Sequence, residues 1–428
     1  MTINLSWERR EVAALAGLLS LSFLVRLLLF PLPGYQIDTT DFTIWLSTAA
    51  NHGIRSFYSI VWSDYPPFNI YVFWVFGSLG KSLSLFGTNL VNYVIKLPPN
   101  LFDVATGFLI YAFVRARLSF RMALLTLAFY VFNPAVIFNA AVWGQYDAIY
   151  TFFLVFSLVL FFARKPEFSA VAIALGLLTK PQGIALLPLI AFIIFIQFGW
   201  RRFLTSVAAF AATVIVVILP FQWSNPVSFL SNIYFGAYQG YTYTSINAFN
   251  IWAFQGFWKP DNIPYFSLGT FKIGYFFLTG WILFGVVTVF MLYLVHKRSK
   301  MSNGLVIVFA AFVFLFSFFM LPTRIHERYL FPALSIGALL VPFFKKTRLI
   351  YIGVSLTCFV NQAFVMYMLR AAYPSGVDLS GSWVALVVSL INLAIFLYVL
   401  MLSWAEFRGR SWLSPIRTEA VGEAPREG

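Results

Sequence analysis

Four ionisable residues lie within five positions of the segment "LPTRIHERYLFPAL", residues 321–334: Arg324, His326, Glu327 and Arg328. The segment separates two apolar runs in a chain of which only 10% of the residues are charged. Ionisable groups at membrane depth are costly, and they usually mark a functional cavity or a charge pair. Arginine can bind two phosphate oxygens with its planar guanidinium. The pattern favours an anion site, although the four groups could instead pair with one another at a helix end.

Four other polar segments are unusual in so apolar a chain. They hold Asp38 and Asp41 ("YQIDTTDF"), Asp64 and Tyr65 ("WSDYPPF"), Trp143, Gln145 and Asp147 ("AAVWGQYDAIY"), and Lys180 and Gln182 ("LTKPQGIALLP"). Each has an ordinary explanation: solvated loop acids, a turn fixed by proline, an interfacial tryptophan, or a lysine whose ammonium reaches the interface. Five such segments on one side of a membrane are stronger support for a site than any one of them.

The chain is 428 residues long and 61% hydrophobic, and apolar runs of about 17–25 residues, the length that crosses a bilayer core, recur along it. We therefore expect an all-α polytopic membrane protein, with residues 1–404 forming a single transmembrane domain. The expected spans number about twelve: 11–30, 93–114, 119–138, 147–163, 168–179, 182–199, 203–220, 271–295, 303–321, 329–344, 349–370 and 382–404. The segment 168–199 is ambiguous, since two short helices or a re-entrant hairpin would both place "TKPQG" at the far turn.

Most of the 29 Lys and Arg residues fall on one side of these spans. By the positive-inside rule this side is cytoplasmic, and it holds both termini. The first helix lacks a cleavage site and is expected to be retained in the cell membrane. Two long loops, 31–92 and 221–270, then lie outside together with all five polar segments, and we expect interfacial helices in the first. The tail, 405–428, is polar and is expected to be disordered.

Composition excludes several classes of site. The single cysteine, Cys358, rules out a disulfide framework and a cysteine-based metal site. The formal charge of +14 fits cytoplasmic loops that face anionic lipid, and we predict no nucleic-acid partner. The outer acids are too scattered to predict a metal-coordination set, so no cofactor is predicted and metal dependence stays open.

Six segments, in chain order, carry a resemblance to a known family: "DTTDFTIW", "DYPPFNIYVFW", "KLPPNLFD", "NPAVIFNAAVWGQYD", "GLLTKPQGIALLP" and "HERYLFPAL". They resemble bacterial and archaeal relatives of the second mannosyltransferase of GPI-anchor assembly, within the GT-C superfamily of integral membrane glycosyltransferases. The similarity to the dolichyl-phosphate-glucose-dependent glucosyltransferases of the endoplasmic reticulum is more distant. The resemblance implies a lipid-linked sugar donor, inversion at the anomeric carbon, and a catalytic aspartate in the first outer loop. Asp38 fits that position, because Phe42 and Trp45 follow it at the family spacing, whereas Asp41 does not fit.

The residues alone point the same way. Nucleotide sugars are cytosolic, so an outward-facing enzyme needs a sugar carried by a membrane lipid such as a polyprenyl phosphate. A phosphodiester leaving group needs positive charge more than a general acid, and one aspartate suffices as base for an acceptor hydroxyl. A glycoside hydrolase would need two paired carboxylates. The residues expected to bind the donor phosphate are Lys180, Arg324, His326 and Arg328, and those expected to contact substrate are Asp41, Tyr65, Trp143, Gln145, Asp147, Gln182 and Glu327.

The sequence therefore predicts an inverting glycosyltransferase that moves a hexose, with mannose preferred, from a polyprenyl-phosphate donor to a lipid- or glycan-linked acceptor outside the cytoplasm. Two alternatives remain at this point. A flippase or transporter of a lipid-linked sugar would also have a polar cavity, but it would not need Asp38. A ligase or polymerase that uses a pyrophosphate-linked oligosaccharide would need room for a larger donor.

Overall fold

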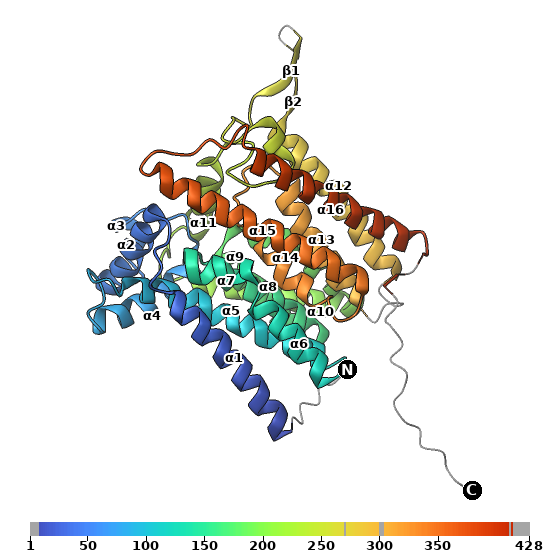
Figure 1. The fold of residues 1–428 in the computed structure, drawn as a ribbon, viewed down its shortest axis with the longest axis horizontal. Coiled ribbons are helices and arrows are strands. Elements are labelled where there is room, and N and C mark those ends of the chain that lie inside the picture. Colours follow the sequence, from blue (N-terminus) through green and yellow to red (C-terminus); the bar gives the residue numbers. More distant parts are fainter. Residues whose placement is uncertain (1–7, 269–270, 299–303, 411, 414–428) are drawn as a thin grey trace.

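The computed structural model describes residues 8–268, 271–298, 304–410 and 412–413. It is mostly helical (Figure 1), as the recurring apolar runs predict. The elements are α1 (Arg9–Leu29), α2 (Gln36–His52), α3 (Phe57–Ile60), α4 (Pro67–Ser82), α5 (Val91–Arg115), α6 (Phe120–Val131), α7 (Pro134–Ile137), η1 (Phe138–Trp143), α8 (Asp147–Phe162), α9 (Pro166–Thr179), η2 (Pro181–Leu186), α10 (Leu187–Ile218), α11 (Pro226–Gln239), η3 (Ile251–Gln255), β1 (Pro264–Leu268), β2 (Phe271–Tyr275), α12 (Phe276–Arg298), α13 (Leu305–Met320), α14 (Phe331–Ala338), α15 (Lys345–Ala372) and α16 (Trp383–Phe407).

Six of the described helices are long and apolar enough to cross a membrane, or seven if the bent pair formed by α6 with α7 and η1 is one span. The six are α1, α5, η2 with α10, α12, α15 and α16. The protein is therefore a multi-pass membrane protein, but the expected count of about twelve spans is not confirmed. The tail expected at 405–428 begins inside α16, and residues 414–428 lie outside the described part of the chain.

The count differs because an apolar run indicates burial, but it does not show whether the run is buried in lipid or inside the protein. Helices α8 and α13 have 16 residues each and α9 has 14, below the roughly 17 needed to cross a bilayer core. Every residue of α13 is buried, as expected of a helix that is apolar all round and packed inside a protein. The expected turn between spans 182–199 and 203–220 falls on a break at Gly199, inside α10.

The segment 31–92 contains three helices, α2, α3 and α4. Figure 1 places α2, α3 and α4 together on the side of the molecule away from α12 and α16. An aromatic cluster joins α2 to α4 and to the start of α8, with Phe42 stacked on Tyr146 at 4.6 Å between ring centroids. The Trp45 indole donates to the carbonyl of Trp62 at 2.8 Å. These contacts fix the first turn of α2 relative to α8.

Buried polar groups tie α1 to its neighbours. Arg26 pairs with Asp103 of α5 at 2.6 Å, and the Tyr130 hydroxyl of α6 donates to the same carboxylate at 2.7 Å. Lys96 of α5 donates to the carbonyl of Phe30 at 3.1 Å, which satisfies a group that the end of α1 leaves free. The chain therefore leaves α1 from a fixed point six residues before α2.

The segment 221–270 contains α11 and η3 and begins a β-hairpin that the sequence did not predict. Strands β1 and β2 pair antiparallel, and α12 consequently begins at Phe276 instead of near residue 271. Before the hairpin, the chain runs beside residues 324–326: the Tyr243 carbonyl accepts from the Arg324 amide at 3.0 Å, and the Ile246 amide donates to the Ile325 carbonyl at 2.9 Å.

Candidate active site

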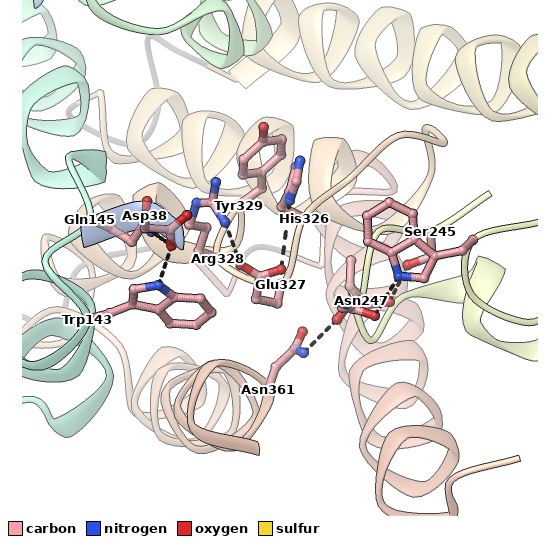
Figure 2. A network of polar contacts seen from close by, with 12 residues as sticks. Asp38, Trp143, Gln145, Ser245, Asn247, His326, Glu327, Arg328, Tyr329 and Asn361 are labelled. Carbon is pink, nitrogen blue, oxygen red and sulfur yellow. Dashed lines mark hydrogen bonds and ion pairs between the residues drawn. The ribbon is translucent and has the colours of Figure 1, made fainter. Parts of the chain in front are cut away.

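Asp38 lies in the first turn of α2, where the helix dipole favours a carboxylate. Its Oδ2 accepts from the Trp143 indole and from the Gln145 amide, each at 2.7 Å (Figure 2). Both of the hydrogen bonds that Asp38 receives from described residues end on Oδ2. Oδ1 is therefore available to accept a proton.

A π-helix presents Trp143 and Gln145 to Asp38. The single π turn η1 ends at Gly144, which has a φ of 85°, a left-handed conformation that glycine adopts without a steric penalty. The Asn139 carbonyl then accepts from the amides of both Gly144, at 3.1 Å, and Gln145, at 2.9 Å. Single π turns of this kind occur often at functional sites.

The chain before α2 packs closely against the end of η1 at Gly34. A Cβ on Gly34 would lie 2.5 Å from the Trp143 carbonyl oxygen, so a side chain there would push the two segments apart. Glycine thus lets the chain before Asp38 pass directly over the end of η1.

Burial raises the pKa of Asp38 above its ordinary value, and the nearby Arg328, the Trp143 hydrogen bond and Lys180 oppose that rise. The pKa of Asp64 is also raised, mainly by burial, while Lys180 and Arg328 oppose the change. Asp41 has a raised pKa because of burial and of its neighbours Asp38 and Asp64. The segment 31–92 therefore places two carboxyl groups, those of Asp38 and Asp64, near the same two cations, with Asp41 beside them.

Those cations, Lys180 and Arg328, share Asp147. Lys180, which directly follows α9, lies 2.7 Å from Asp147 Oδ1, and Arg328 Nε lies 3.7 Å from Oδ2. Asn139 donates to the same Oδ2 at 3.1 Å. Arg328 also donates to Glu327 at 2.6 Å (Figure 2). The Nε of Arg328 is buried and makes no hydrogen bond to the described residues. Because Nη1 donates to Glu327, Nη2 of this cavity-lining arginine is left for an anionic ligand.

A cavity of about 150 Å³ opens beside these cations, many times the roughly 10–15 Å³ needed for one water molecule. Its polar walls include Asp64, Lys180, Gln182, His326 and Arg328. Tyr65 also lines it, with its ring 5.1 Å from the Lys180 nitrogen. Asp38 is not among the lining residues, although it lies within electrostatic reach of both cations. The space suits a phosphate-sized group.

The four residues expected to bind phosphate differ in what they can offer. Arg324 is already engaged: its guanidinium donates to both oxygens of the buried Asp261, at 2.7 and 3.1 Å, and to the Tyr238 carbonyl at 3.1 Å. Burial, Arg328 and Lys180 lower the pKa of His326 well below its ordinary value, so the imidazole is neutral near pH 7 and can only hydrogen-bond. Arg324 also lines the cavity, but all three of its guanidinium nitrogens are engaged. Lys180 and Arg328 each hydrogen-bond one carboxylate through a single nitrogen, Lys180 to Asp147 and Arg328 to Glu327, so they are the cations at the cavity with N–H groups left for a phosphate.

The five polar segments picked out in the sequence thus meet at one place. Gln182 reaches this site through its amide, which donates to the Tyr329 hydroxyl, and Glu327 lies 3.8 Å from the His326 ring nitrogen. Sequence reasoning gave no role to Tyr329 or Asp261. It noticed Asp64 as an acid just before "YPP" in one of the five polar segments, but it did not name Asp64 among the site residues.

Helices long enough to cross a membrane, and charged side chains gathered at one cavity between them, define a membrane protein with a built polar site. A family model then gives its class: glycosyltransferase family 87 matches residues 62–322. The chain belongs to this family and is a membrane glycosyltransferase. The matched range contains Asp64, Trp143, Asp147 and Lys180, begins after Asp38, and ends before Arg328. Comparison with curated proteins found no match.

Proposed function

We propose that the protein is an inverting, GT-C-type glycosyltransferase that moves a hexose, with mannose preferred, from a polyprenyl-phosphate donor to a lipid- or glycan-linked acceptor on the extracytoplasmic side. The observation that carries the proposal is the position of Asp38. Its Oδ1 is unoccupied, and it lies close to two cations that line a cavity of phosphate size.

The reaction is a single displacement. The acceptor hydroxyl attacks the anomeric carbon, and its proton passes to Asp38 Oδ1. The bond between this carbon and the phosphate oxygen breaks, and its electron pair leaves with the phosphate. Arg328 and Lys180 stabilise the negative charge that develops there. Attack from the side opposite the leaving phosphate inverts the configuration of the sugar.

Other site residues have supporting parts in this proposal. Trp143 and Gln145 orient the base, and Asp147 and Glu327 hold the two cations in place. His326 and Gln182 offer neutral hydrogen bonds to the headgroup, and Tyr65 forms an apolar wall. Arg324 braces the loop that carries His326, and Asp41 lies one turn beyond the base.

The test is transfer by the purified protein from labelled polyprenyl-phosphate mannose and, separately, glucose to extracted membrane lipids and glycans. Asp38→Asn keeps the shape of the side chain but cannot take up the proton, so we expect turnover to fall on the order of 10²–10⁴-fold with donor binding retained. Asp41→Asn is the matched control and should show a milder defect. Turnover within about threefold of wild type in Asp38→Asn, together with an inactive Asp41→Asn or Asp147→Asn, would assign the base to one of those residues.

A further inference from the structure

An apolar groove continues directly from the polar cavity. It holds about 340 Å³ and lies between the end of α9, α10 and α11. Its walls include Leu178, Val214 and Leu230. Ile184 and Tyr234 line both the groove and the cavity, so the two spaces share a boundary. A ligand with a polar head and an apolar chain could occupy both at once.

The groove opens on a face that meets lipid. Helix α10 belongs to a candidate membrane span, and Ile184, which lines the groove, has 50% of its surface exposed. On α11, which forms the other wall, Val227 is 78% exposed. No charged side chain lines the groove in the described part of the chain. Large exposed apolar patches on a membrane protein face hydrocarbon, so an apolar chain can enter the groove sideways from the bilayer.

The walls are held by specific hydrogen bonds. The Tyr234 hydroxyl donates to the Leu177 carbonyl at 2.8 Å, which joins α11 to α9 at the boundary with the cavity. The Tyr71 hydroxyl of α4 donates to the Val217 carbonyl of α10 at 3.0 Å. A groove fixed in this way is formed before any ligand binds, which lowers the ordering cost of binding.

We infer that this groove holds the first part of the isoprenoid chain of the donor, with its phosphate in the cavity beside Lys180 and Arg328. The inference rests on the proposed function and deepens it. Lipid tails are as apolar as the groove, so the groove adds little driving force. Instead, the groove orients the donor: it holds the chain so that the phosphate and the anomeric carbon face the base.

A second apolar groove supplies a matched control. It lies along α12, is lined by residues that include Gly285 and Val289, and shares no lining residue with the cavity. Val214→Trp would fill the groove that continues from the cavity, and Val289→Trp would place the same side chain in the groove that does not. Both substitutions add the same bulk on a lipid-facing helix.

The experiment compares two donors, polyprenyl-phosphate mannose with a long chain and the same headgroup on a single isoprene unit. We expect Val214→Trp to raise KM for the long-chain donor about tenfold, or about 1.4 kcal/mol, because overpacking excludes the chain. The short-chain donor should react with unchanged KM, which also shows that the variant is folded. Val289→Trp should resemble wild type with both donors.

Equal effects on the two donors in Val214→Trp, or the same loss in Val289→Trp, would overturn the groove assignment. An unchanged long-chain KM in Val214→Trp would also overturn it and would leave the groove to ordinary membrane lipids. If wild-type protein transfers sugar from neither donor, the proposed function fails instead, so the two failures are distinguishable.

Discussion

Asp64 illustrates how a second carboxyl group can serve an anion site. It lines the cavity together with Lys180 and Arg328, and burial raises its pKa. A protonated carboxyl group can donate a hydrogen bond to phosphate, whereas an ionised one would repel it. The protonated fraction of Asp64 falls as the pH rises through its raised pKa, so donor binding should weaken with increasing pH.

Asp64→Asn mimics the protonated acid at every pH. We expect this variant to remain active and to lose the rise in donor KM that wild type should show as the pH increases through the raised pKa of Asp64. Steady-state kinetics across the pH range would measure it, with Asp38→Asn as the inactive comparison. A fully inactive Asp64→Asn variant that still binds donor would instead identify Asp64 as the base.

The two arginines of "TRIHER" offer a matched pair of substitutions, because only one of them has a free donor. Arg328→Lys keeps the charge but loses the planar fork, so we expect donor KM to rise roughly 10-fold, within the range for lost charged hydrogen bonds; Arg328→Ala should be more severe. Arg324→Lys should leave donor KM near wild type and lower the melting temperature, because Asp261 is fully buried and loses its bidentate partner. The opposite result, a KM effect at Arg324 alone, would place the phosphate at the other arginine.

At the scale of elements, η1 connects the helical bundle to the base. Asn100 of α5 donates to the Ala140 carbonyl of η1 at 2.8 Å and to the Lys96 carbonyl at 2.7 Å. Asn100→Ala removes both hydrogen bonds, at a cost of about 1–3 kcal/mol, and frees the turn that presents Trp143. We expect lower kcat with little change in donor KM.

Asn69 of α4 is the control. It is equally buried, but neither of its amide atoms is hydrogen-bonded to described residues. Asn69→Ala should therefore cost less stability and leave kcat unchanged. Equal loss of kcat in both variants would contradict a positioning role for Asn100.

The elements also show how far the sequence could be read. Helices long enough to span, such as α1, α5, α15 and α16, lie close to the predicted runs, because period and length both identify them. The 16-residue α13, predicted as a span, is not confirmed as one, because hydropathy does not separate lipid from a protein interior. The β-hairpin and the π turn at Asn139 depend on pairing and on hydrogen bonds that no local pattern shows.

For the site, too, the sequence predicted some features and not others. Its members were found because charges in an apolar chain are conspicuous, and residues as distant as Asp38 and Arg328 do approach one another. The role of each of these residues was harder to predict from the sequence. Arg324 and Arg328 look alike in sequence, and only Asp261, 63 residues before Arg324, separates a brace from a free donor.

At the scale of the whole molecule, the donor argument depends on orientation, because lipid-linked sugars are needed only where nucleotide sugars are absent. The basic loops predict that the start of α15 faces the cytoplasm and the end of α2 faces outward. Asn51 and Lys345 are both exposed, so cysteine at either position is accessible to reagent. The native Cys358 is fully buried and gives little background labelling.

In intact cells, Asn51→Cys should react with an impermeant maleimide, and Lys345→Cys should react only after permeabilisation. Labelling of Lys345→Cys in intact cells, with Asn51→Cys protected, would place the cavity in the cytoplasm, where a nucleotide sugar becomes the natural donor and the groove beside α10 loses its proposed occupant.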